Sequence, residues 1–181
     1  MPDAQSQLRM GFTQFDSLRA PELPPGYGLR TFRPGDEEPW IALLATGDFG
    51  EWDRPRLDRL LSGERAPLPL DGVFFATRGE QIVGAACVFL HLGESGDVPE
   101  LGWVAVHPAH RGHGLGLQVC RAALRFIRDR GHGYAYLLTE EFRLPAIKTY
   151  LRLGFEPEML DATQPARWEA LRRVLAGKGT P

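Results

Sequence analysis

The stretch VAVHPAHRGHGLGL at residues 104–117 has the residue types of an anion-binding loop. Its glycines let a backbone approach a phosphate closely, and Arg111 adds a fixed charge with parallel donors. Apolar residues precede the loop and a long amphipathic segment follows it, so the unpaired N–H groups at a helix start would face the ligand. The pattern predicts a pyrophosphate site, and a tight strand-to-helix turn is the plain alternative.

Two common phosphate-binding classes do not fit this chain. It contains no G-x-x-x-x-G-K-[ST] sequence, which argues against a P-loop nucleotidase. The glycine loop also lies past the middle of the chain, whereas the loop of a dinucleotide-binding fold usually follows the first strand.

The spacing R-x-x-G-x-G at Arg111, Gly114 and Gly116, together with Val106 and Pro108 upstream, resembles the signature of the GNAT superfamily of acyl-CoA-dependent N-acyltransferases. A second piece, FRLPAIKTYLRLGFEPEM, is similar to the family pattern N-x-x-A-x-x-x-Y-x-x-x-G-F. The matching positions are Ala146, Tyr150, Gly154 and Phe155. Arg143 replaces the asparagine that helps to hold the cofactor in the family, and a guanidinium can supply donors there.

The resemblance implies an α/β fold with a mixed, largely antiparallel central sheet flanked by helices. It implies transfer of an acetyl or other short acyl group from acyl-CoA to a primary amine, with acetyl-CoA as donor and no metal. A non-catalytic acyl-CoA-binding or sensing module and a nucleotide-binding or interaction domain are the alternatives. The resemblance assigns cofactor contacts to Val104, Ala105, Val106, Arg111, Gly112, His113, Gly114, Leu115, Gly116, Leu117 and Arg143.

Catalytic candidates follow from the same resemblance and from what amide formation requires. Tyr150 matches the acid that protonates the departing thiolate, and the alternative is a core tyrosine with a hydrogen-bonded hydroxyl. Glu100 is at a place where some family members carry a general base, and Glu140 and Glu141 compete with it. No dedicated base is needed if the amine arrives neutral.

The acceptor side is less well defined by the sequence. Glu51, Trp52 and Asp53 are candidate substrate contacts, because in the family the region between the first strand and the second often helps to form the acceptor pocket. Glu140, just beyond the strand expected at 134–139, is a further candidate contact. The plain alternative is that Trp52 packs beneath a helix corner while the acids face water. The sequence identifies no particular amine.

The histidines at positions 107, 110 and 113 invite a metal-site interpretation, because they recur every third residue. A loop does not place such residues on one face as a helix does, and no carboxylate or thiolate set lies nearby in the sequence. We therefore expect no metal site, although one of these histidines could neighbour a phosphate.

The elements that position these residues can be read from periodicity and turn residues. A strand at 27–32 leads to a helix with Asp36 at its N-cap and an end near Gly47, and a second helix is expected at 55–61. Strands are expected at 73–77, 81–91, 98–106 and 134–139, the last parallel to 98–106 through the helix after the glycine loop. On strand 98–106, alternation places Leu101, Trp103 and Ala105 on one face.

Downstream, Pro145 suits a helix start, and Ile147 and Leu151 should face the core. Gly154 should end this helix, Phe155 should open a strand, and residues 168–175 should be helical.

Composition favours one globular domain. The chain has 181 residues, of which 43% are hydrophobic. We expect an unpacked, proline-containing arm at 1–26, a single domain at 27–176 and a tail at 177–181. A net charge of −2 offers no general attraction to nucleic acid or a membrane. The polar start without an apolar segment behind it favours a soluble cytoplasmic protein with reduced thiols at Cys87 and Cys120. Monomer and homodimer are both open.

Overall fold

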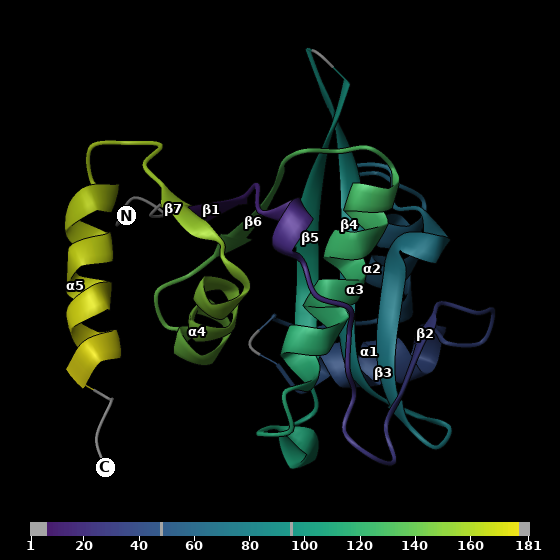
Figure 1. Ribbon diagram of the computed structural model, residues 1–181. Helices are drawn as coiled ribbons and strands as arrows, with labels where there is room; N and C mark the ends of the chain where they lie inside the picture. The colour runs from purple at the N-terminus through teal and green to yellow at the C-terminus, as the bar shows by residue number, and fades with distance from the viewer. Residues whose placement is uncertain (1–6, 48, 95, 178–181) are drawn as a thin grey trace.

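The computed structural model describes residues 7–47, 49–94 and 96–177, which form a single sheet with helices on both sides (Figure 1). The sheet has 7 strands in the order β2-β3-β4-β5-β6-β1-β7. Neighbouring strands are antiparallel except β5 and β6, which are parallel. The strands are β1 (Leu8–Phe12), β2 (Gly28–Thr31), β3 (Val73–Arg78), β4 (Gln81–Gly93), β5 (Gly96–Val106), β6 (Ala135–Thr139) and β7 (Glu156–Glu158).

The helices divide between the two faces of the sheet. They are α1 (Glu37–Ala45), α2 (Arg54–Leu61), α3 (Leu115–Asp129), α4 (Leu144–Leu153) and α5 (Gln164–Gly177). The core on one face contains side chains of α3, α4 and α5, and the core on the other face contains those of α1 and α2 (Figure 1). The expected mixed, mostly antiparallel α/β fold is confirmed, and so is the parallel pairing of β5 with β6 through α3.

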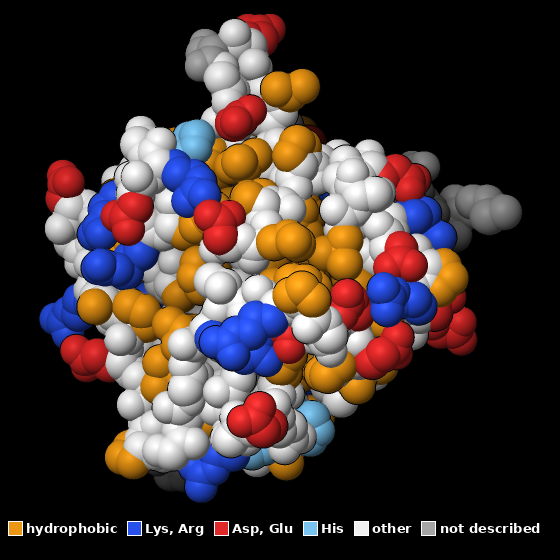
Figure 2. Space-filling model, turned by 90° about the vertical axis from the view of Figure 1, so that its right-hand side faces the viewer, with side chains coloured by type: hydrophobic (Ala, Val, Ile, Leu, Met, Phe, Trp, Pro, Cys, Tyr) orange, Lys and Arg blue, Asp and Glu red, His pale blue; other side chains and the backbone are white. Residues whose placement is uncertain are grey.

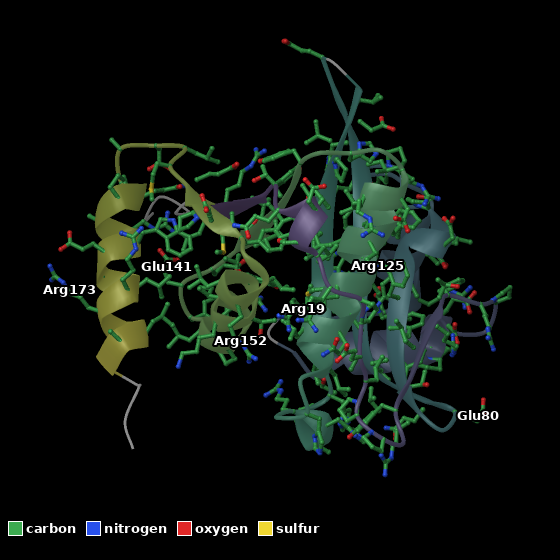
Figure 3. The ribbon with its side chains drawn as sticks, in the orientation of Figure 1. Arg19, Glu80, Arg125, Glu141, Arg152 and Arg173 are labelled. Carbon is green, nitrogen blue, oxygen red and sulfur yellow. The ribbon has the colours of Figure 1, made fainter. Side chains whose placement is uncertain are left out.

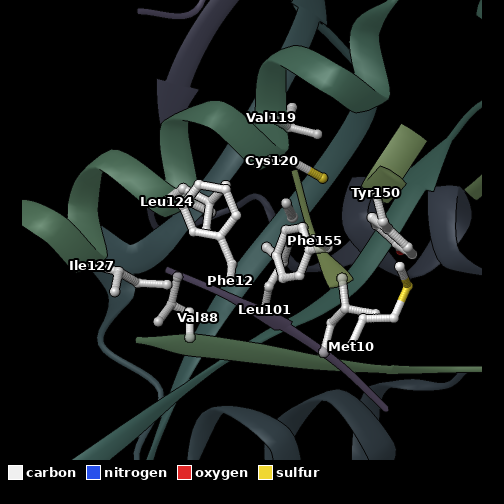
Figure 4. Packing of buried hydrophobic residues seen from close by; sticks show 14 of the residues in the cluster. Met10, Phe12, Val88, Leu101, Val119, Cys120, Leu124, Ile127, Tyr150 and Phe155 are labelled. Carbon is white, nitrogen blue, oxygen red and sulfur yellow. The ribbon is translucent and has the colours of Figure 1, made fainter. Parts of the chain in front are cut away.

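The helix after the glycine loop is amphipathic, as expected, and buries one apolar face. Val119, Cys120, Leu124 and Ile127 of α3 pack against the sheet, together with Phe12 from β1 (Figure 4). Fully burying one such side chain contributes roughly 1.5–3 kcal/mol to folding. This packing holds the start of α3, and therefore the glycine loop, against the ends of β4 and β5.

The expected arm at residues 1–26 is wrong for Leu8–Phe12. This segment is strand β1, paired between β6 and β7, and Leu8 and Met10 are 0% exposed. The sequence LRMGF carries the apolar and non-apolar alternation of a half-buried strand, and the prolines that favour an extended arm begin only further along, at Pro21. The expected domain boundary at residue 27 therefore separates β1 from its own sheet. Residues 1–6 and 178–181 lie outside the described residues.

The expected alternation along β5 is also wrong, because the strand contains a β-bulge. Ala105 pairs with Ala85 and Gly102 with Cys87, so Trp103 and Val104 together oppose the single residue between those partners. Trp103 has a φ of 48°, in the left-handed region. Leu101 consequently packs on the α3 face and Ala105 on the α1 face.

The ends of the helices mostly follow the predicted signals. Gly154 ends α4 in a left-handed conformation with a φ of 100°, and Ile147 is buried as expected. Leu151 is 40% exposed, so its expected core position is wrong. Asp36 precedes α1, but its carboxylate binds the Arg30 guanidinium and the Arg33 N–H instead of a helix N–H.

The surface carries charges of both signs. On the face shown in Figure 2, basic and acidic side chains are interspersed among hydrophobic ones, and the hairpin of β4 and β5 projects beyond the body of the molecule. Within the described part of the chain, no helix is long and apolar enough to cross a membrane.

Candidate active site

The parallel strands β5 and β6 separate soon after they meet, and a cleft opens between them. Their only pairing among the described residues is Glu100 with Tyr136. The cleft has a volume of about 840 Å³. Its walls come from β5, the glycine loop, the end of β6 and α4, so strand 98–106 and both sequence motifs meet in one place.

The glycine loop forms one end of the cleft and presents backbone donors. Gly112 and Gly114 have φ angles of 82° and 74°, and an added Cβ would meet nothing within 4 Å at either position. Glycine is therefore required there by the backbone conformation and not by lack of space. The N–H groups of residues 112–117 donate no backbone hydrogen bond within the described residues. Such a set of free donors at the start of α3 suits an anion.

Most of the predicted loop contacts line the cleft. These residues are Arg111, Gly112, Gly114, Leu115, Gly116 and Leu117. Arg111 is anchored by an Nε donor bond of 3.3 Å to the Val106 carbonyl. The His113 side chain is not among the cleft-lining groups; it lies against the carbonyls of His110 and Arg111 and packs 5.5 Å from the Tyr27 ring.

The edge of β5 forms the side wall. Val104, Ala105 and Val106 all line the cleft. Beyond Glu100, this edge has no partner strand within the described residues, so its backbone groups are available to an extended ligand that pairs as a strand does. The bulge at Trp103 and Val104 adds backbone groups that are out of register with β4.

Tyr150 and Arg143 enter the cleft from α4 and the turn before it. Tyr150 is buried with its ring 5.9 Å from that of Phe155, and burial raises the pKa of its phenol well above the ordinary value. The phenol is therefore protonated at neutral pH. Arg143 donates from Nε to Glu140 at 2.5 Å, and its guanidinium lies 4.5 Å from the centre of the Phe49 ring.

Glu100 forms the end of the cleft opposite the glycine loop. It is 3% exposed, and Arg65 Nη2 donates to both of its oxygens at 2.7 and 2.8 Å. His91 Nε2 lies 2.7 Å from Oε2, and the Tyr136 hydroxyl donates to the same oxygen at 3.2 Å. Burial, followed by the nearby Glu100 carboxylate, raises the pKa of Tyr136 to about 12. Among the described residues, Oε1 has one hydrogen-bond partner, Arg65, whereas Oε2 has three.

The two competing glutamates occupy different environments. Glu140 lines the cleft, where it accepts hydrogen bonds from Gln7 at 2.7 Å and from Arg143. Glu141 points to α5 instead, and its hydrogen bond from Arg167 lowers the pKa of its carboxyl (Figure 3). Glu141 is therefore not placed to act in the cleft.

The candidate contacts Glu51, Trp52 and Asp53 do not line the cleft. Asp53 caps α2 by accepting a bond of 2.8 Å from the Arg56 N–H, and the Glu51 carbonyl accepts from the Arg56 side chain. Trp52 is buried with its ring edge-on to Trp103, with 4.7 Å between ring centres. The carboxylates of both acids face solvent, as the plain alternative expects.

Several cleft groups were missed by sequence reasoning. Arg65, Phe49 and Trp103 line the cleft, and His91 and Tyr136 support Glu100 from neighbouring strands. The position of His91 near the end of a predicted strand is the one signal that the sequence offered. Arg65 follows α2 in an irregular segment, where no sequence signal indicated a role in the cleft.

The three loop histidines lie close to one another but bond to other groups. His110 Nδ1 lies 3.1 Å from the Tyr27 hydroxyl, and His107 Nδ1 accepts from the Ala109 N–H. Partial burial and the neighbouring histidines lower the pKa of His110. Across the described ranges, no group of His, Cys, Asp and Glu side chains is arranged to hold a metal ion.

Comparison with known proteins gives one consistent family. The family model described as Acetyltransferase (GNAT) family matches residues 37–155. A mycothiol acetyltransferase from Thermobispora bispora is 36% identical over 162 residues, which are 86% of this chain and 55% of the relative. One from Rhodococcus erythropolis is 33% identical over 153 residues, 78% of this chain and 51% of the relative. The chain thus spans about half the length of these curated relatives.

Solved structures share the fold. A GCN5-related N-acetyltransferase from Sphaerobacter thermophilus aligns with a TM-score of 0.69 at 24% identity, covering 85% of this chain and 50% of that one. A protein described as a transcriptional regulator from Bacillus halodurans aligns with a TM-score of 0.60 at 25% identity, covering 75% of this chain and 97% of that one.

Proposed function

The chain belongs to the acetyltransferase (GNAT) family, and from that premise we propose that it transfers an acetyl or other short acyl group from acyl-CoA to a primary amine. The observation that carries the proposal is the arrangement of the cleft. Free backbone donors lie at one end, an unpaired strand edge runs along the side, and a buried carboxylate lies at the other end. Acetyl-CoA is the proposed acyl donor, and the reaction requires no metal.

The glycine loop and the strand edge suit the two parts of the donor. The N–H groups of residues 112–117 and the Arg111 guanidinium supply hydrogen bonds and positive charge to a pyrophosphate. The open edge of β5 at residues 104–106 supplies alternating donors and acceptors to the amide groups of a pantetheine arm. We expect a backbone N–H of this wall to stabilise the negative charge that develops on a thioester oxygen.

Transfer then needs two bond changes and two proton transfers. The neutral amine nitrogen forms a bond to the acyl carbon, the bond from that carbon to sulfur breaks, and the sulfur leaves with the electron pair. Tyr150, kept protonated by burial, supplies a proton to the thiolate. The nitrogen loses one proton as it becomes an amide, and this proton goes to Glu100, directly or through water. It then returns through solvent to the Tyr150 phenolate, so both groups recover their starting protonation.

Glu100 suits the role of base because its position is fixed and its Oε1 can still accept a further hydrogen bond or a proton. A carboxylate has about four lone-pair sites, and Oε1 has one hydrogen-bond partner among the described residues. Arg65, His91 and Tyr136 hold the carboxylate from three sides, so these are positioning residues. Glu140 is the alternative base within the cleft, but its two oxygens are each bonded to Gln7 or Arg143.

A panel of amines with acetyl-CoA tests the proposal by following release of free thiol. The relatives named mycothiol acetyltransferase make mycothiol-related amines one part of the panel, beside polyamines, amino sugars and amino acids. We expect acetyl-CoA-dependent turnover with at least one amine, and its loss in Glu100→Gln. Tight binding of acetyl-CoA without turnover by any amine would instead support a sensing module, the second candidate, which the likeness to a protein described as a transcriptional regulator favours.

A further inference from the structure

A second, smaller hollow adjoins the Glu100 end of the cleft, where the acceptor amine is proposed to bind. The proposed reaction does not use this hollow. It has a volume of about 220 Å³, and its lining includes Arg56, Arg59 and Leu60 of α2. Helix α2 lies on the opposite face of the sheet from α3 (Figure 1). Arg65 and Trp103 line both the hollow and the cleft. We propose that this hollow binds an oxyanion, a carboxylate or phosphate group, carried by the acceptor amine. The proposal rests on the proposed function and specifies its substrate class.

The charge of the hollow favours an anion. Its lining contains Arg56, Arg59 and Arg65 against a single acid, Glu64. Arg59 has no acidic partner within the described residues. Arg65 is balanced by Glu100, but among the described residues no carboxylate lies at bonding distance from Arg56 or Arg59. An anion therefore gains attraction here without displacing an existing ion pair.

Arg56 is held in place by neutral groups. Its guanidinium donates to the backbone carbonyls of Phe49 and Glu51 and lies 4.3 Å from the centre of the Trp52 ring. Neither a carbonyl nor an indole cancels the charge. The side chain is therefore both fixed and still cationic, and a fixed guanidinium loses little conformational freedom when it binds a carboxylate or phosphate.

The indole rings make an apolar wall that strengthens such an interaction. Trp52 and Trp103 meet edge to face, with an interplanar angle of 86°. Trp103 keeps this place although its φ of 48° is unfavourable for a residue with a side chain. Backbone strain of this kind is retained where the surrounding structure over-determines it and often lies at functional sites. The strain at Trp103 positions the wall that the hollow shares with the cleft.

Arg65 lies between the cleft and the hollow, so it determines which end of a bound acceptor lies in each. Its Nη2 bonds to Glu100 in the cleft, while the same side chain lines the hollow. An amine presented to Glu100 can therefore extend past Arg65 and Trp103, so that its far end meets Arg56 and Arg59. The geometry points to an acceptor with an amine at one end and an oxyanion at the other.

Matched acceptors test the proposal through kcat/KM with acetyl-CoA. ω-Amino acids from glycine to ε-aminocaproate are each compared with the alkylamine of equal chain length, and phosphoethanolamine is compared with ethanolamine. We expect one oxyanion-bearing acceptor to exceed its uncharged partner by about tenfold, the effect of one charge-assisted hydrogen bond. The two series distinguish a carboxylate from a phosphate.

Arg59→Glu should abolish this preference and leave the rates of the alkylamines unchanged, and Arg59→Gln should reduce it. Arg172→Glu, which reverses an exposed charge on α5, is the matched control and should keep the preference. Arg59 lies in the last turn of α2, where a cation also stabilises the helix end. A purely structural role predicts a lower Tm of Arg59→Glu with the preference intact, and that result would overturn the proposal.

Tryptophan fluorescence gives a readout that does not need turnover, because Trp52 and Trp103 line the hollow. Titration of the preferred ω-amino acid should change the emission of the wild type but not that of Arg59→Glu. Turnover of both members of every pair at equal rates, with unchanged fluorescence, would refute the oxyanion site and leave the proposed function standing. A fluorescence response specific to oxyanions without any turnover would support the site and refute the acyl transfer.

Discussion

The two ends of the cleft are built in different ways. The loop end comes from one continuous stretch, residues 106–117, and its donors are backbone N–H groups. The far end is assembled from Arg65, His91, Glu100 and Tyr136, which come from the segment after α2 and from β4, β5 and β6. Backbone donors depend on local dihedral angles, whereas a side-chain cluster needs the whole sheet in place. The far end should therefore respond more sharply to the loss of one side chain.

Glu100→Gln is the change with the largest expected effect. We expect kcat/KM to fall by about 100-fold or more, since a positioned acid or base contributes about 10²–10⁴. The Kd of acetyl-CoA should be unchanged, because Glu100 lies at the other end of the cleft from the loop. Steady-state thiol release and calorimetric titration measure the two quantities, and the Tm of the variant reports that it is folded.

Glu141→Gln is the matched control for this change, because Arg167 holds that carboxylate outside the cleft. Its kcat/KM should equal that of the wild type. Full activity of Glu100→Gln, combined with loss of activity in Glu140→Gln, would show that Glu140 is the base and Glu100 is not.

Gly114→Glu tests whether the loop end depends on its backbone. The substitution places a negative charge among the free N–H groups and strains a residue with a φ of 74°. We expect the affinity for acetyl-CoA to fall by about 100-fold, or about 2.7 kcal/mol. Gly131→Glu carries the same charge, also at a positive φ of 83° with open space around it, beyond the other end of α3. Equal losses in both variants would show that strain, and not the phosphate cradle, is responsible.

Tyr150→Phe should lower kcat by about tenfold and leave the Kd of acetyl-CoA unchanged, because only the proton donor is lost. Burial disfavours the phenolate, so the pKa of Tyr150 lies above the ordinary value of about 10 and the donor form persists through neutral and mildly alkaline pH. The pH profile of kcat should accordingly show no loss of activity from this group below about pH 10. Normal turnover by Tyr150→Phe would show that Tyr150 is not the acid that protonates the thiolate.

Arg111→Ala should have the smallest effect of the four. Its side chain is exposed and its charge is screened by solvent, so we expect the Kd of acetyl-CoA to rise by about fivefold. The comparison variant is Arg172→Ala on α5, which should bind normally. A loss as large as that of Gly114→Glu would mean that the loop end, like the far end, depends on a side chain.

The loop end and much of the fold could be predicted from the sequence because their signals are local. The glycine positions, the apolar face of α3 and the Gly154 cap each depend on neighbours within a few residues. The family resemblance predicted both the family and the mixed α/β fold. The family match confirms the first, and the observed sheet confirms the second. The roles of Tyr150 and Glu100 stay predictions until the variants are measured.

The remaining features depend on contacts between distant segments. The strand β1 is short, and its place between β6 and β7 is set by residues more than a hundred positions away in the chain. The bulge at Trp103 reverses the alternation of β5, and no residue type announces it. Arg65 reaches Glu100 across a sequence separation of 35 residues, which no periodic pattern encodes.

Thermal unfolding with and without acetyl-CoA tests the central claim, that the cleft binds an acyl-CoA through the glycine loop. Ligand at about one hundred times its Kd stabilises a fold by about 2.7 kcal/mol, which for a domain of this size raises Tm by roughly 5–10 °C. We predict that shift for acetyl-CoA, its loss in Gly114→Glu, and no shift with ATP or NAD. An unchanged Tm at saturating acetyl-CoA would contradict the claim, because the loop would then be only a turn between β5 and α3.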